Sequence, residues 1–157
     1  MGLISVSYPI FTRVFSADSV GYPRVMTEEL NLLGSNPEMP SSRKEAVIET
    51  FANPSPGRDY WIELHTQEYT SKCPVTGQPD FGSITIRYVP KELCIETKSL
   101  KFYLSSYRNE ECFNEMAVNW MLDDLVKACV PTKMIVKGEF ASRGGIRVVV
   151  EASHPDS

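Results

Sequence analysis

The chain has 157 residues, 42% hydrophobic and 23% charged, which suits a single domain with a hydrophobic core. Its formal net charge of −4 argues against a surface that binds nucleic acid strongly, because phosphate backbones require concentrated Lys and Arg. The sequence contains neither an apolar run near the roughly 20 residues of a membrane span nor the basic region of a signal peptide, so we expect a cytoplasmic protein with no membrane partner.

The first part of the chain, residues 1–45, mixes aromatic residues, prolines and serines without sustained periodicity. We interpret it as an N-terminal arm that precedes a single domain over residues 46–157. The sequence leaves open whether the arm covers the domain or a neighbouring subunit, or is partly disordered. Residues 44–51 are predicted to form a short helix that ends at the Pro- and Gly-rich segment 53–57.

Two strands are predicted on either side of a long loop. Apolar and polar residues alternate in 59–67 and again in 83–89, which indicates a half-buried strand in each segment. The loop between them, residues 70–82, carries two prolines and two glycines, so its backbone freedom is restricted and it can hold Cys73 near Asp80. Taken alone, the loop is compatible with a nucleophile and its proton partner, or with an inert thiol.

The remaining cysteines do not indicate a metal site. The chain has four cysteines, which are widely spaced, and two histidines, whereas zinc sites generally use closely spaced ligand pairs. We therefore predict reduced thiols and no bound metal. Cys94 and Cys129 fall at a strand end and on an apolar helical stripe, so packing is the simpler interpretation for both.

The second half of the sequence predicts two helices and two more strands. Residues 97–108 place apolar side chains on one helical face and Lys98 and Lys101 on the other. The two lysines either form an ordinary solvated face or contact a phosphate group. Residues 114–130 carry a longer apolar stripe that ends at a proline, and 134–140 and 146–152 alternate as strands. The order strand, strand, helix, helix, strand, strand predicts an α+β fold, a four-stranded antiparallel sheet with two helices on one face.

Two segments together are similar to the signature of a known enzyme family. Cys73–Asp80 (CPVTGQPD) and Glu96–Tyr103 (ETKSLKFY) resemble the single-module form of the NADPH-dependent nitrile reductases of queuosine biosynthesis. Matches continue at Tyr107–Asn109, Phe113–Glu115 and Ser142–Gly145, so the resemblance covers roughly residues 32–150. It implies the tunnelling fold shared with GTP cyclohydrolase I, a homo-oligomeric multi-subunit barrel with active sites at subunit interfaces.

The resemblance also implies a reaction and a role for each matching residue. The nitrile of 7-cyano-7-deazaguanine would be reduced to the aminomethyl group with two NADPH, through a thioimide on the nucleophile Cys73, with Asp80 delivering a proton. Substrate binding would fall to Glu115, Asn114, Phe113 and Glu96. Cofactor binding would fall to Lys98, Lys101, Arg143 and Gly144.

One position departs from the family pattern, which usually has Phe-His-Glu where this chain has Phe113-Asn114-Glu115. Asn hydrogen-bonds but does not exchange a proton near neutral pH, so any acid/base role of that histidine is lost. Two alternatives stay open: an amidinotransferase that acts on the nitrile already in tRNA without NADPH, and an inert binding or scaffold protein. The retained 96–103 segment and the acidic composition argue against the first.

Overall fold

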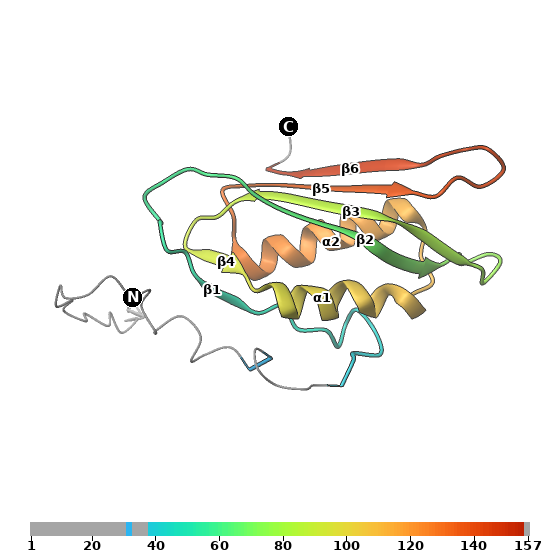
Figure 1. The fold of residues 1–157 in the computed structure, drawn as a ribbon, viewed down its shortest axis with the longest axis horizontal. Helices are drawn as coiled ribbons and strands as arrows, with labels where there is room; N and C mark the ends of the chain where they lie inside the picture. Colours follow the sequence, from blue (N-terminus) through green and yellow to red (C-terminus); the bar gives the residue numbers. More distant parts are fainter. Residues whose placement is uncertain (1–30, 33–37, 156–157) are drawn as a thin grey trace, which may run out of the picture.

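The computed structural model describes residues 31–32 and 38–155 (Figure 1). The predicted arm over residues 1–45 therefore lies mostly outside the described residues. In chain order the elements are β1 (Thr50–Ala52), β2 (Ile62–Lys72), β3 (Pro79–Val89), β4 (Leu93–Ile95), α1 (Thr97–Ser106), the 3₁₀ helix η2 (Tyr107–Asn109), α2 (Asn114–Cys129), β5 (Lys133–Phe140) and β6 (Val149–His154).

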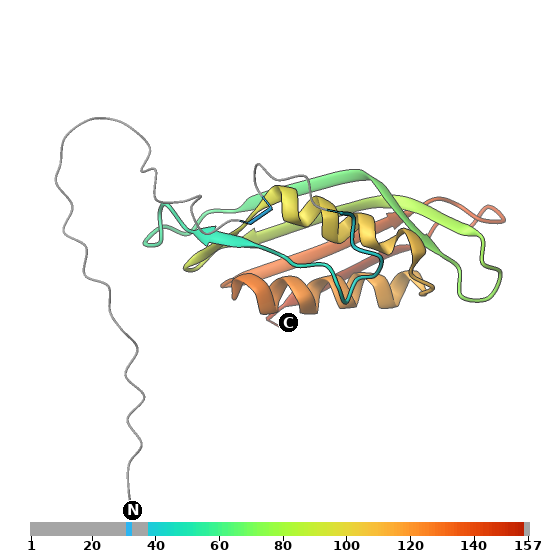
Figure 2. The ribbon, with the colours of Figure 1, turned by 90° about the horizontal axis from the view of Figure 1, so that it is seen from below.

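The main sheet has four strands in the order β2-β3-β5-β6, and every neighbouring pair is antiparallel. Both helices lie on one face of this sheet, with α1 against β2 and α2 against β5 and β6 (Figures 1 and 2). This arrangement confirms the predicted α+β fold. A second, two-stranded sheet of β1 and β4 was not predicted.

The core lies between the sheet and the two helices. Strand alternation sends Ile84, Ile86 and Tyr88 of β3 to this side, where each side chain is buried. The predicted helical stripes are also buried, apart from half-buried Leu104 in α1 and Val126 in α2. The buried residues of α2 are Ala117, Val118, Met121, Leu122, Leu125 and Cys129.

The predicted strand ends shift in the structure. β2 begins at Ile62 and continues to Lys72, and β3 already begins at Pro79, so the loop shortens to residues 73–78. The extra residues pair with one another, from Tyr69↔Gly82 to Lys72↔Pro79, after a bulge between Thr66 and Tyr69. The bulge interrupts the two-residue alternation, which is why the sequence pattern ended too early. β6 begins three residues later than predicted, because residues 143–146 form a tight turn.

The short helix predicted over residues 44–51 is wrong. Residues 43–45 form a turn, and Thr50–Ala52 form β1, which pairs with β4 in the register Thr50↔Ile95 to Ala52↔Leu93. The β-branched and aromatic residues of β1 suit an extended strand, and the distant partner β4 decides the outcome over local helix propensity. Arg43 joins this segment to α2 through an ion pair with Asp124, 2.6 Å between Nη1 and Oδ2.

The contact between α2 and β5 generates a stability prediction. A Cβ built on Gly138 of β5 would lie 2.8 Å from Phe140 Cε2 and from Val118 Cγ2, closer than real Cβ atoms approach. We expect Gly138→Ala to lower the free energy of unfolding by about 1–3 kcal/mol, because the packed core must shift. Gly57→Ala is the matched control, since nothing lies within 4 Å of its added Cβ. Equal urea midpoints for the two variants would contradict this account of the packing.

Candidate active site

Cys73 opens the short loop that joins β2 to β3, at the end of the molecule where α2 begins (Figure 1). The Cys73 N–H donates to the Gln78 carbonyl and the Gly77 N–H donates to the Cys73 carbonyl, both at 2.9 Å. Gly77 has φ +67°, which L side chains rarely adopt, so the glycine allows this closed turn. The loop therefore holds the backbone of Cys73 from both sides.

The Cys73 thiol differs electrostatically from the other three. Its pKa is lowered, first by the Thr76 hydroxyl and then by the backbone N–H groups of Thr76 and Val75, while the nearby Asp80 carboxylate opposes the shift. The other three thiols are buried, and burial raises the pKa of each, to about 12 for Cys129. Because the thiolate is the nucleophilic form, the lowered pKa makes Cys73 the candidate nucleophile among the four cysteines.

Asp80 lies on β3 directly across from Ser71 of β2, so cross-strand pairing brings its side chain to the Cys73 end of the hairpin. Its carboxylate accepts a hydrogen bond from Arg143, 2.7 Å between Nη2 and Oδ1. Arg143 comes from the turn between β5 and β6, and the same Nη2 also donates to the Pro79 carbonyl at 2.7 Å. The structure thus brings Cys73, Asp80 and Arg143 together from three different segments.

The start of α2 is joined to the same end by backbone hydrogen bonds. The Lys72 N–H donates to the Glu110 carbonyl at 2.9 Å, and the Cys112 N–H donates to the Lys72 carbonyl at 3.2 Å. Lys72 immediately precedes Cys73 and Cys112 lies two residues before the first residue of α2, so this pairing brings the start of α2 close to Cys73. The predicted substrate-binding residues Phe113, Asn114 and Glu115 follow immediately.

These three residues present different surfaces. The Phe113 side chain is 52% exposed, so it does not act as a core staple. Glu115 is exposed in the first turn of α2, where the helix dipole favours a carboxylate. The Asn114 Oδ1 atom is buried, with no hydrogen-bond partner among the described residues. An aromatic face, a carboxylate and an unused acceptor suit a flat heterocycle that carries N–H groups.

The remaining predicted site residues lie elsewhere. Glu96 caps α1, and its carboxylate accepts hydrogen bonds from the backbone N–H groups of Lys98 and Ser99 at 2.8 and 2.6 Å. The Lys98 ammonium donates to the Leu32 carbonyl. These residues lie at the start of α1, and the Cys73 loop lies beyond its far end (Figure 1). A ten-residue helix spans about 15 Å, so one chain does not bring the two groups together.

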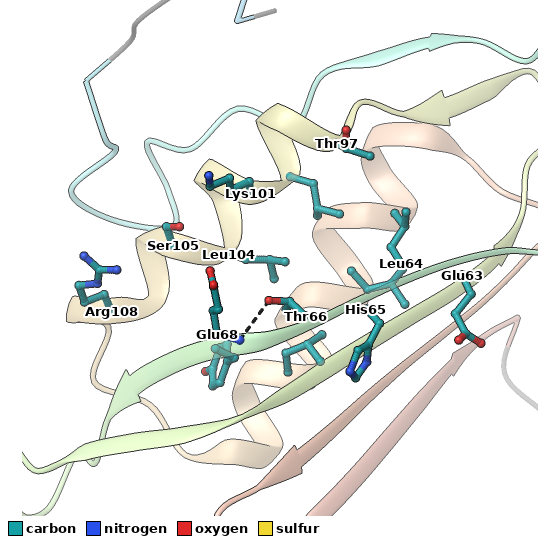
Figure 3. A pocket seen from close by; sticks show the side chains of 14 residues that line it. Glu63, Leu64, His65, Thr66, Glu68, Thr97, Lys101, Leu104, Ser105 and Arg108 are labelled. Carbon is teal, nitrogen blue, oxygen red and sulfur yellow. Dashed lines mark hydrogen bonds between the residues drawn. The ribbon is translucent and has the colours of Figure 1, made fainter.

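Lys101 lines the wall of a cavity of about 500 Å³ between α1 and β2 (Figure 3). Arg108, Ser105 and Thr97 lie on the same wall, and Glu63 and Glu68 belong to the opposite strand. A cation with hydroxyl neighbours fits the chemistry of a phosphate group. Sequence reasoning missed Arg108, although its position seven residues after Lys101 places both on one helical face.

Gly144 supplies the turn that carries Arg143. Gly144 and Gly145 have φ +57° and +82°, and Arg143 and Ile146 exchange two backbone hydrogen bonds of 3.0 Å across them. This is the two-residue hairpin turn in which both central residues need positive φ. Among residues 31–32 and 38–155, no group of three His, Cys, Asp or Glu side chains is arranged to hold a metal ion. No helix in the described part of the chain is long and apolar enough to cross a membrane.

Comparisons with known proteins agree on one family. A family model described as QueF-like protein matches residues 79–157. A protein of Anaeromyxobacter sp. (strain K) is 53% identical over 107 residues, which are 68% of this chain and 88% of that protein. A protein of Helicobacter pylori (strain HPAG1) is 50% identical over 125 residues, 78% of this chain and 84% of that protein. Both are named NADPH-dependent 7-cyano-7-deazaguanine reductase.

A solved structure shares the fold. The crystal structure of the archaeosine synthase QueF-Like in the apo form has a TM-score of 0.58 and 23% sequence identity, and the match covers 62% of this chain and 95% of that chain. At this identity the likeness supports the fold alone.

The electrostatics of the loop predict which thiol reacts first. At pH 7, iodoacetamide should modify Cys73 of the native protein well before the other three cysteines, read by peptide mass spectrometry. The rate should rise with pH through the Cys73 pKa, because only the thiolate attacks. Thr76→Val removes the hydroxyl donor, so the rate at pH 7 should fall about two- to tenfold. Thr132→Val, outside the loop, is the control; an unchanged rate in Thr76→Val would contradict the assigned cause.

Proposed function

Because this chain belongs to the QueF-like protein family, we propose that it is an oxidoreductase that reduces the nitrile of 7-cyano-7-deazaguanine to an aminomethyl group with NADPH. The names of its relatives support this reaction, which the resemblance of its two signature segments assigns to queuosine biosynthesis. The observation that carries the proposal is the pairing of an activated thiol with a carboxyl group at one end of the sheet.

The chemistry begins with covalent capture at Cys73. The Cys73 thiolate attacks the nitrile carbon, a carbon–sulfur bond forms, and one C≡N π pair moves to the nitrogen. Asp80 gives the nitrogen a proton, which leaves a neutral thioimide. The C=N carbon of this thioimide accepts hydride more readily than the nitrile does. NADPH, when bound, supplies the hydride that each of two successive reductions needs.

The start of α2 supports recognition of the deazapurine. Glu115 accepts hydrogen bonds from the N–H and amino edge of the base, and Phe113 stacks on its face. The buried Asn114 Oδ1 offers an acceptor for a further N–H. Asn114 stands where the family usually has histidine, so the proton needed at the nitrogen falls to Asp80. The proposed substrate is the free deazapurine rather than a base already in tRNA. The acidic net charge of −4 agrees with this choice.

Lys98 and Lys101 supply the charge for the cofactor phosphates, and Arg108 borders the same cavity. Lys98 lies in the first turn of α1, at the opposite end of this helix from the loop that carries Cys73, so we infer that a second copy of the chain completes the site. Large apolar side chains exposed at the Cys73 end support such an interface. They are Val75 (77% exposed), Phe81 (58%), Phe113 (52%) and Ile146 (71%). We therefore propose a homo-oligomer with its active sites between subunits, in the cytoplasm where NADPH and the free base are available.

The alternatives receive less support. Relatives named as reductases are 50–53% identical, whereas the archaeosine synthase structure is 23% identical. A scaffold protein would not need a thiol whose pKa is lowered. Glu96 is buried and caps α1. Its role within one chain is therefore to fix the start of this helix.

Covalent capture tests the function most directly. Protein mixed with 7-cyano-7-deazaguanine and no NADPH should gain one ligand mass per chain on Cys73, and adding NADPH should release the aminomethyl product while absorbance at 340 nm falls. Cys73→Ala should show neither event, and Cys129→Ala is the matched control. An adduct that forms and then consumes ammonia but no NADPH would move the assignment to the amidinotransferase.

A second prediction concerns the cofactor. Lys101→Ala should raise the NADPH KM about fivefold or more, the usual effect of losing one charge-assisted contact, while adduct formation on Cys73 stays unchanged. Helix stability should hold, because Ala is the better helix former. Lys127→Ala, an exposed lysine of α2, is the control. If both variants keep the wild-type NADPH KM, the cavity beside α1 is not the phosphate site.

A further inference from the structure

The resemblance to nitrile reductases assigned Arg143 to cofactor phosphates, but its guanidinium contacts Asp80. We propose that Arg143 is a positioning residue for Asp80, whose carboxylate it pairs with and orients beside Cys73, so that Asp80 acts first as the base that accepts the thiol proton. This inference rests on the proposed function, because it concerns the order of proton transfers at the same site. It does not depend on any contact with the cofactor.

The geometry fixes both the acid and the arginine. Arg143 Nη2 lies 2.7 Å from Asp80 Oδ1 and 2.7 Å from the carbonyl oxygen of Pro79, the preceding residue. One nitrogen thus links the backbone at the start of β3 to the adjacent carboxylate. The Asp80 side chain is 14% exposed and the Arg143 side chain 44%, so the carboxylate is shielded from solvent and Arg143 is its ion-pair partner.

Arg143 itself is held by the Gly144–Gly145 turn. Its backbone N–H donates to the Ile146 carbonyl and its carbonyl accepts from the Ile146 N–H, both at 3.0 Å. Ala141 anchors the beginning of the turn, because its N–H donates to the Phe81 carbonyl at 2.8 Å. The turn is therefore tied to β3 one residue after Asp80, which keeps the guanidinium close to the carboxylate.

No other cation in the described part of the chain lies within ion-pair distance of Asp80. The groups that interact with it from the neighbouring segments are the thiols of Cys73 and Cys112, and Glu110 adds negative charge beside Cys112. Lys72 precedes Cys73, but strand alternation directs it to the opposite face of β2 from Ser71. Arg143 alone therefore compensates the Asp80 charge near the nucleophile.

The pair gives a balanced proton path. The Cys73 S–H proton passes to the Asp80 carboxylate, and the sulfur electron pair forms the bond to the nitrile carbon. The displaced π pair becomes a lone pair on nitrogen, and the same proton returns to it from Asp80. Arg143 holds the carboxylate in place before and after this cycle, so the same oxygen atoms face the thiol and then the nitrogen.

The test reads Cys73 ionisation without nitrile or NADPH, through the pH dependence of iodoacetamide alkylation. Arg143→Gln leaves the Asp80 charge uncompensated, which disfavours the thiolate. We expect the rate at pH 7 to fall roughly two- to fivefold and the profile to move to higher pH. Arg147→Gln is the matched control, because Arg147 forms a 2.7 Å ion pair with Glu139 in the same hairpin. Its profile should match the wild type.

A double-mutant cycle isolates the contact. If Arg143 acts through Asp80, Arg143→Gln should have little effect on the alkylation profile once Asp80→Asn has removed the charge. Arg143→Lys keeps the positive charge and should recover part of the wild-type rate. The proposal is overturned if Arg143→Gln leaves the profile unchanged, or changes it equally with and without Asp80→Asn. Because the nitrile is never added, failure of the proposed reaction would show separately, as absence of the Cys73 adduct.

Discussion

The site depends on the backbone pairing between the end of β2 and the residues just before α2. Two hydrogen bonds, from the Lys72 N–H to Glu110 and from the Cys112 N–H to Lys72, join segments about 40 residues apart in sequence. Without them Cys73 would sit at the tip of an isolated hairpin. With them, Cys73 and the start of α2 are held together by backbone hydrogen bonds. The position of the thiol relative to a deazapurine bound at α2 would then be set by the backbone rather than by flexible side chains.

Reactivity at Cys73 has a local and a tertiary component. The local component is the loop, whose Thr76 hydroxyl and N–H groups favour the thiolate. The tertiary component is the Asp80 charge, which opposes ionisation and is compensated by Arg143 from a hairpin more than 60 residues later in the chain. Loop chemistry alone would make an activated thiol with no proton partner. In the role proposed for Arg143, the ion pair lets the Asp80 carboxylate lie near Cys73 without suppressing the thiolate.

The sequence predicts the elements that are determined by local patterns, and it misses those that depend on contacts between distant segments. Alternation in 83–89 and the apolar stripe of α2 report burial directly, so the sequence predicted both elements. Cys73 and Asp80 were expected near each other because they are close in sequence, although Asp80 belongs to β3 rather than to the loop. β1 was missed because its only reason to be extended is β4, which pairs with it from 43 residues away. Arg143 was assigned to phosphate for the same reason, since its contact with Asp80 exists only after β3 and β5 pair. The Glu96 cap was overlooked because glutamate is not a usual N-cap residue.

The fold divides the predicted site between two ends of one subunit. Cys73, Asp80 and the start of α2 lie at one end, whereas Glu96 and Lys98 lie at the start of α1, at the other end of that helix, and Lys101 lies midway along it. Within the described residues, β2 and β6 each pair along one side only, so both edges of the sheet are available for another chain. Exposed apolar residues surround the Cys73 end. In the homo-oligomer proposed above, a second copy supplies the α1 start, and capture at Cys73, which uses one end only, is the part of the proposed chemistry that a single chain supports.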